Sequence, residues 1–235
     1  MQLYADDSKL LADVSSVDGV RGLQRDLDSI VRWSEKWLLG LNSRKCHVMH
    51  VGRNNQEHEY WLGLDHTKAR LETINSEKDL GVIVSNDLKW AEQCSRASAK
   101  GNMMLGMLRR SFSSRNVDLW RKLYVTYVRL LIEFAVSMWA PYLEADIKTL
   151  ERIQRRATRI PFEKFINIPT YEERCKIMSL QPLSARRVRG DIIQWFKIEK
   201  SLENVNWISS PGVVEGRCGR RPQLRGEIVK GCEQR

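Results

Sequence analysis

Two adjacent aspartates near the start of the sequence are the residues best suited to chemistry. They stand in the tetrapeptide YADD as Asp6 and Asp7, behind Tyr4. Short apolar segments flank them, which predicts a β-hairpin with both carboxylates near its turn. Mg²⁺ is bound by a few carboxylates together with substrate phosphates and water, and a cation relieves the repulsion between neighbouring aspartates. The stretch therefore suggests a two-metal nucleotidyl-transfer site, with an ordinary surface turn as the alternative.

Basic residues are distributed unevenly along the chain, whose formal net charge is +10. Residues 1–91 contain 12 Lys and Arg against 14 Asp and Glu, whereas residues 92–235 contain 27 against 15. The first part is therefore close to neutral, and the second carries the whole basic excess. A polyanion, above all nucleic acid, is the expected partner of the second part, with a solvated basic face as the alternative.

A stripe of four arginines is the most ordered part of this excess. The segment ADIKTLERIQRRATRI predicts an amphipathic helix, with Ile147, Leu150, Ile153, Ala157 and Ile160 on its apolar side. Roughly opposite, at positions i, i+3, i+4 and i+7, stand Arg152, Arg155, Arg156 and Arg159. No carboxylate separates them, so their repulsion favours an anion against the stripe. We interpret it as a contact to a phosphate backbone, with a solvated face as the alternative.

A second arginine cluster opens another predicted helix within residues 171–198. Arg186, Arg187 and Arg189 lie near its start, after the break at Pro182. Positive charge near a helix N-terminus is unfavourable for the helix dipole. We therefore expect these arginines to face a partner as well.

The elements that must position these residues predict an α+β fold. Residues 19–40 have helical periodicity, with Ser15 as the expected cap, Leu38 on the apolar face and Gly40 as the stop. Residues 45–52 alternate like a strand, and residues 79–90 combine a buried strand with an Asn-Asp turn.

From residue 92 onward the predicted structure is helical. One long core helix is expected between Ser114 and Pro141, with an apolar face of Leu119, Leu123, Tyr127, Leu130, Leu131, Phe134 and Met138. Residues 201–235 are aperiodic and rich in Gly, Pro and Arg, which is typical of a flexible basic tail. The expected organisation is thus residues 1–91, then the helical part at 92–200, then the tail at 201–235.

Several other classes of site are excluded by spacing. The five cysteines form no CxxC pair, which favours free thiols in a reducing compartment. In KCHVMHVG, strand alternation separates His47 from Cys46 and His50, so a packed strand is expected there and not a zinc site. The most apolar stretch, VRLLIEFAVSMWA, is short and interrupted by Glu133, so we expect an intracellular protein without a membrane partner.

In order along the chain, these segments resemble the reverse transcriptases of non-LTR (LINE) retrotransposons, in particular the Jockey-like lineage. The resemblance covers roughly residues 1–200. It rests on YADD with KLLADV, LQRDLDSIVRWSEKWLLGLN, KCHVMHVG, EKDLGVIVSNDLKW, LWRKLYVTYVRLLIEFAVSMWAP, LERIQRRATRI and YEERCKIMSLQPLSARRVRGDIIQWFKI. It implies the end of a polymerase palm, containing the Tyr-Ala-Asp-Asp hairpin, followed by a helical thumb that grips the template–primer duplex.

The resemblance also implies roles for individual residues. Asp6 and Asp7 match the pair that binds the catalytic Mg²⁺ ions, with Mn²⁺ as a substitute, and Tyr4 matches the tyrosine beside the primer end. Lys45 matches a palm lysine that protonates the leaving pyrophosphate, with an ordinary solvated lysine as the alternative. The implied partners are an RNA template and a DNA primer, and the nucleus is the location expected for the complete element.

The sequence departs from the family pattern at its start. Only Met1, Gln2 and Leu3 precede Tyr4, so we expect this sequence to lack the upstream palm strand with a further aspartate, the fingers and the endonuclease that the resemblance implies for a complete enzyme. We therefore expect a nucleotidyltransferase fragment, an RNA-directed DNA polymerase that is inactive alone. The alternatives are a non-enzymatic, nucleic-acid-binding remnant and an inert product of a decayed element.

Overall fold

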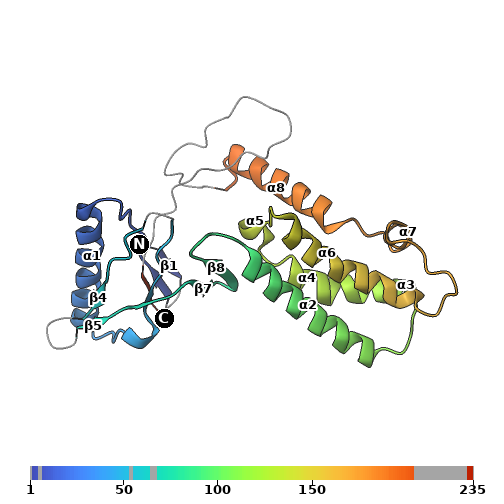
Figure 1. Cartoon of the computed structure of the whole chain (residues 1–235), viewed down its shortest axis with the longest axis horizontal. Coiled ribbons are helices and arrows are strands. Elements are labelled where there is room, and N and C mark those ends of the chain that lie inside the picture. Colours follow the sequence, from blue (N-terminus) through green and yellow to red (C-terminus); the bar gives the residue numbers. More distant parts are fainter. Residues whose placement is uncertain (1, 5–6, 53–54, 64–67, 204–231, 235) are drawn as a thin grey trace. The chain divides into compact units, whose positions relative to one another are not determined.

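The computed structural model describes residues 2–4, 7–52, 55–63, 68–203 and 232–234 (Figure 1). The chain divides into two compact units. The N-terminal unit contains Met1–Glu77, Ser85–Leu88 and Asn206–Arg235, and the helical unit contains Lys78–Val84 and Lys89–Val205. The expected mixture of helices and strands is confirmed, with most strands in the first unit and most helices in the second. The assignment of a polymerase palm stays a prediction.

Helix α1, Val17–Lys36, packs its apolar side into the core of the N-terminal unit. Its cap is Ser16, one residue after the predicted Ser15, and the Ser16 side chain accepts a hydrogen bond from the backbone N–H of Gly19 at 3.1 Å. The prediction that Leu38 continues the apolar face is wrong, because the helix ends at Lys36. Leu38 has φ 56° and is 92% exposed, so the chain turns before reaching Gly40.

The first two strands form the predicted hairpin. Strand β1, Gln2–Tyr4, pairs antiparallel with β2, Asp7–Lys9, and Tyr4 stands opposite Asp7 in the last pair before the turn. Three more strands complete a five-stranded sheet in the order β1-β2-β9-β3-β6: β3 is His47–Val48, β6 is Glu72–Thr73 and β9 is Cys232–Gln234. Strand β9 thus comes from the segment expected to be a flexible tail, of which residues 204–231 lie outside the described part.

Helix α1 is held against a second, two-stranded sheet of β4, Trp61–Leu62, and β5, Ala69–Arg70 (Figure 1). The side-chain amide of Gln24 donates to the backbone carbonyl of Trp61 at 2.8 Å and accepts from its N–H at 3.0 Å. Around this contact the buried core of the unit consists of Leu10, Leu23, Leu27, Val31, Cys46, Val48, Tyr60, Leu62 and Leu71.

A second hairpin precedes helix α2, Ala91–Ser111. Strands β7, Ser76–Asp79, and β8, Val82–Ser85, are joined by Leu80 and Gly81, whose φ values are 45° and 91°. Two consecutive positive φ values are typical of the tight turns that join antiparallel strands. The sequence predicted one strand here, whereas the chain reverses at Leu80–Gly81. The predicted Asn-Asp turn is confirmed, since the N–H of Leu88 donates to the carbonyl of Ser85 at 2.9 Å.

The helical unit is built around two long helices that lie side by side, α2 and α6 (Figure 1). A Cβ atom added to Gly101 of α2 would lie 2.7 Å from Ile132 of α4 and 3.3 Å from Ile153 of α6, so glycine permits α2 to approach both helices closely. The bounds are α2 Ala91–Ser111, α3 Val117–Leu123, the π-helix η3 Tyr124–Arg129, α4 Leu130–Ile132, α5 Val136–Trp139, α6 Glu144–Arg159, η4 Ile160–Phe162, α7 Tyr171–Ile177 and α8 Leu183–Glu199.

The single long helix predicted between Ser114 and Pro141 is wrong. The cap is Asn116, the π-helical segment η3 follows α3, and the chain breaks after Ile132, with Ala135 at φ 51°. A π-helical turn contains more residues than an α-helical turn, so it shifts the buried face along the sequence. Val128 and Ile132 are buried, whereas the predicted core residues Tyr127, Leu130, Phe134 and Met138 are exposed.

Candidate functional site

The arginine stripe lies on α6, as the periodicity predicted. Leu150, Ile153 and Ala157 are buried beneath the helix, and Ile160 continues this face into η4. The four arginines, Arg152, Arg155, Arg156 and Arg159, are all exposed. Within the described residues, none of the four forms an ion pair with a carboxylate. The stripe therefore carries positive charge that the described part of the chain does not neutralise by direct pairing.

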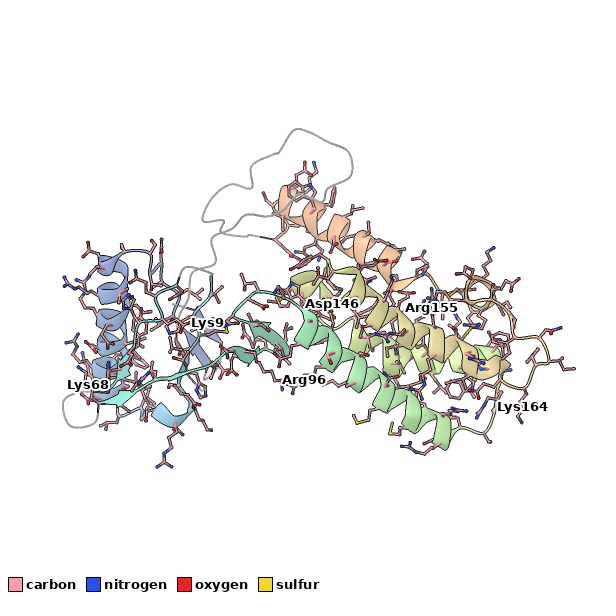
Figure 2. The ribbon with its side chains drawn as sticks, in the orientation of Figure 1. Lys9, Lys68, Arg96, Asp146, Arg155 and Lys164 are labelled. Atoms are coloured by element: carbon pink, nitrogen blue, oxygen red, sulfur yellow. The ribbon has the colours of Figure 1, made fainter. Side chains whose placement is uncertain are left out.

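Neutral side chains hold three of these arginines in place. The Arg152 Nη2 donates to the hydroxyl of Thr149 at 2.8 Å, and the Arg156 Nη1 donates to the side-chain carbonyl of Asn102 on α2 at 3.1 Å. The Arg155 guanidinium stands over the ring of Tyr171, 4.8 Å from its centroid, and projects from α6 in Figure 2. These contacts fix the side chains without cancelling their charge.

Hydrogen bonds to two side chains of α6 hold the Tyr171 hydroxyl in place. This hydroxyl donates to the Oε1 of Glu151 and accepts from the side-chain amide of Gln154 at 2.9 Å. Burial is the main cause that raises the pKa of Tyr171, and the adjacent Glu151 carboxylate raises this pKa further. The phenol is therefore neutral under ordinary conditions and gives Arg155 a rigid aromatic support.

Gln154 joins three elements beneath the stripe and was missed by the sequence analysis. This fully buried side chain accepts from the Tyr124 hydroxyl at 2.8 Å and donates to Tyr171 and to the backbone carbonyl of Gln181 at 3.0 Å. It thus connects α6 to η3, to α7 and to the segment before α8. A signal was available, because Gln154 stands four residues after Leu150 and so falls on the buried side of the helix.

The prediction that Arg186 and Arg187 face a partner needs correction. The Nε of Arg186 donates to the Oε1 of Glu133 at 2.8 Å, and its Nη2 donates to the Oε2 at 3.0 Å. Arg187 is only 4% exposed. The helix break leaves the Glu133 carboxylate 14% exposed, and Arg186 neutralises it together with Arg129, whose Nε lies 3.7 Å away. A carboxylate distant in the sequence thus takes the place that a partner was expected to fill; Arg189, by contrast, is exposed.

The aspartate hairpin is described only in part. Asp7 is half-buried at the start of β2, and the backbone of Tyr4 lies directly opposite it. Asp6 and the side chain of Tyr4 lie outside the described residues. Lys45 is exposed at the end of the short 3-10 helix η1, Ser43–Lys45, just before β3. The described residues contain no group of three or more His, Cys, Asp or Glu side chains that could hold a metal ion.

The segment around β3 shows the alternation that the sequence predicted. Cys46, Val48 and His50 are buried, whereas His47 is half-buried with its Nδ1 3.9 Å from Glu72. Cys46, Cys94 and Cys175 are free thiols within the described part. The prediction of a packed strand agrees with this arrangement.

The comparisons with known proteins give no relative: no family model, curated protein or solved structure matches the chain. Among the described residues, no helix is both long enough and apolar enough to cross a lipid bilayer.

Proposed function

We propose that this chain is part of an RNA-directed DNA polymerase of the non-LTR retrotransposon type, and that its helical unit binds the phosphate backbone of a template–primer duplex. The observation that carries the proposal is the α6 stripe, where four exposed arginines stand without an ion-pair partner among the described residues. Nucleic acid supplies the closely spaced negative charge that such a row can neutralise.

The contacts around the stripe favour backbone recognition over base recognition. Arg155 and Arg156 are supported by Tyr171 and Asn102, so little conformational entropy is lost when they bind a phosphate. The Tyr171 ring is covered by Arg155, and Arg174 lies 6.0 Å from its centroid, which leaves this ring a poor stacking surface for a base. Phosphate contacts of this kind fix position and carry no sequence preference.

The polymerase part of the proposal rests on the hairpin and on the sequence resemblance. Asp6 and Asp7 are the residues that would hold Mg²⁺, or Mn²⁺ in its place, and oxygen ligands at a hairpin turn suit either ion. The ions would activate the attacking hydroxyl and stabilise the leaving phosphate. Lys45 is the proposed proton donor to that group, and Tyr4 the residue beside the primer end.

Duplex binding tests the proposal directly. We expect the full chain to bind a short RNA–DNA hybrid duplex, with an affinity that falls steeply with salt. Replacing Arg155 and Arg156 with alanine should lower the slope of log K against log salt by about two, one for each lost phosphate contact. The matched control is Arg21→Ala with Arg25→Ala, which removes the same charge from exposed positions on α1. Equal losses in both double variants would contradict the assignment of the stripe.

A polypeptide of these 235 residues is expected to bind without polymerising. Two adjacent aspartates without a further carboxylate hold metal ions weakly, and the resemblance places the nucleotide pocket in the fingers. Primer extension with Mg²⁺ or Mn²⁺ measures this, and extension that Asp6→Ala abolishes would refute the expectation.

The second candidate is a nucleic-acid-binding module with no part in catalysis. The same charge asymmetry and the same stripe favour it. It differs from the first in one outcome: weak Mn²⁺ binding by the chain that Asp7→Asn reduces would support the first candidate, whereas the second predicts no metal binding that depends on Asp7. A chain that binds no duplex at any salt concentration would instead fit an inert product.

A further inference from the structure

Strands β2 and β3 of the N-terminal unit do not pair with each other. Strand β9 stands between them and is antiparallel to both. Its Glu233 is opposite Lys9 on one side and His47 on the other, with Gln234 opposite Ser8 and Cys232 opposite Val48. A sheet whose middle strand comes from the far end of the chain is complete only when that end is in place.

A strand between β2 and β3 is needed to satisfy the backbone groups of both. Val48 of β3 is buried, and so is Leu10, which directly follows β2. Without an inserted strand, backbone N–H and C=O groups on both facing edges would lose their partners beside this apolar core. A backbone in extended conformation satisfies both edges at once, and this requirement does not depend on the identity of its side chains.

We propose that the gap between β2 and β3 is a strand-binding site, which the chain fills with its own C-terminal segment and which accepts the same segment as a separate peptide. The class of ligand is an extended peptide, bound by antiparallel backbone pairing on both sides. The attached segment occupies the site in the free protein, because attachment gives it an effective concentration in the millimolar range. A peptide therefore binds when this internal strand is weakened or when the peptide is in large excess.

The site borders the aspartate hairpin. Because Gln234 is opposite Ser8 and the strands are antiparallel, the C-terminal end of β9 lies one position from the level of Asp7. The inference is independent of the proposed polymerase function, since it concerns the sheet alone. If the proposal is correct, however, backbone hydrogen bonding in the sheet that contains the aspartate hairpin depends on which strand occupies the gap.

Hydrogen exchange on the full chain tests whether β9 is required. Glu233→Pro removes a backbone donor from the middle of the strand, while Glu233→Ala keeps it. We expect Glu233→Pro to increase amide exchange of residues 8–9 and 47–48 about tenfold, the equivalent of one lost hydrogen bond. The helical unit should be unaffected, and Glu233→Ala should resemble the unaltered chain. Equal exchange in the two variants would overturn the proposal.

Adding the peptide in trans tests whether the gap is a binding site. A peptide of residues 228–235, with serine in place of Cys232, should restore protection in the Glu233→Pro chain, and the same peptide with proline at position 233 should not. Failure of the first peptide would overturn the proposal, as would equal restoration by both.

A second measurement covers the outcome in which Glu233→Pro unfolds the N-terminal unit. A millimolar excess of the peptide, or of its version with proline at position 233, is added to the unaltered chain, and both peptides carry a photo-crosslinking group at position 232. Crosslinks to residues 8–9 and 47–48 that the proline peptide does not give would support the site. Crosslinks spread over the whole surface, or none at all, would overturn it.

Discussion

The two units of this chain bury different kinds of core. The helical unit encloses large rings, with Trp120, Tyr124 and Trp139 almost completely buried among its helices. In the described part of the N-terminal unit the buried core is smaller and mostly aliphatic, with Tyr60 as its aromatic member. Small cores bury a smaller fraction of the chain and leave less free energy in reserve. The sheet of the N-terminal unit, in addition, contains a strand from the far end of the sequence, β9.

Two buried tyrosine hydroxyls, those of Tyr124 and Tyr60, also differ between the units. In the helical unit, Gln154 gives the Tyr124 hydroxyl a hydrogen-bond partner and connects three elements. In the N-terminal unit, the buried Tyr60 hydroxyl has no hydrogen-bond partner among the described residues. A satisfied network favours a single arrangement of the helices around it, whereas an unpaired buried group costs free energy.

The same substitution in the core of each unit should reveal the largest difference in stability between them. Leu27 and Leu150 are both fully buried, and replacing either with alanine should cost about 2–5 kcal/mol. We expect Leu27→Ala to unfold the N-terminal unit and Leu150→Ala to leave the helical unit folded, with a lower unfolding midpoint. Thermal unfolding combined with hydrogen exchange of each unit measures this. The comparison would fail if the helical unit were the one to unfold.

Removing Arg186 should weaken the helical unit by an intermediate amount. Arg186→Ala removes three hydrogen bonds from the largely buried Glu133 carboxylate, while the Nε of Arg129 stays 3.7 Å from it. A loss of about 1.5–3 kcal/mol is expected for bonds to a charged group in this position. The exposed neighbour Arg189→Ala is the control and should change the free energy of unfolding by less than about 0.5 kcal/mol. Equal effects in chemical denaturation would mean that Arg186 faces solvent or a partner, as the sequence first indicated.

Alkaline pH should destabilise the helical unit through Tyr124. Burial raises the pKa of this phenol above its ordinary value of 10.0, so the folded state retains the proton. Its contribution is fully present below pH 10 and is lost as the pH rises above 10, because the unfolded chain ionises first. The expected slope is about 1.4 kcal/mol per pH unit for this group.

Two tyrosine variants test the alkaline prediction, and the quantity compared is the slope of unfolding free energy against pH. Tyr124→Phe should reduce the decline of stability above pH 10 by the share of one group, because Tyr171, whose pKa is also raised, still contributes; the variant also removes a hydrogen bond to Gln154. Tyr142→Phe, at an exposed position, should leave the slope as it is. Burial also raises the pKa of Cys94 to about 12, so a shallower decline should begin near pH 9 in both variants. Identical slopes for the two tyrosine variants would refute the role given to Tyr124.

The smallest expected effects come from the helix caps. Ser16 caps α1 and Thr170 caps α7, and each side chain accepts from a backbone N–H of the first turn. Alanine at either position should cost about 1 kcal/mol. Thr170→Ala should cost more than Ser16→Ala, because Glu173 also accepts from the Thr170 N–H at 2.7 Å and from its hydroxyl at 2.9 Å. Amide hydrogen exchange in α1 and α7 measures the two losses of stability. A larger loss for Ser16→Ala than for Thr170→Ala would contradict the ranking.

Local patterns in the sequence determined several features. The Tyr4–Asp7 hairpin, the buried side of α6 and the alternation from Cys46 to His50 all follow from the spacing of polar and apolar residues. Each concerns neighbours within one turn or one strand pair, where the periodicity of the backbone fixes which side chains share a face. The exposure of the four α6 arginines belongs to this group.

Tertiary structure decided the features that depend on contacts between distant segments. Because of the π-helical turn, Val128 is buried in place of the predicted Tyr127. The Arg186 side chain pairs with Glu133 and does not face a partner. Strand β9 entered the sheet because β2 and β3 both needed a backbone partner. No local period encodes such choices, since each is settled by which distant group can satisfy a buried charge, a cavity or an unpaired edge.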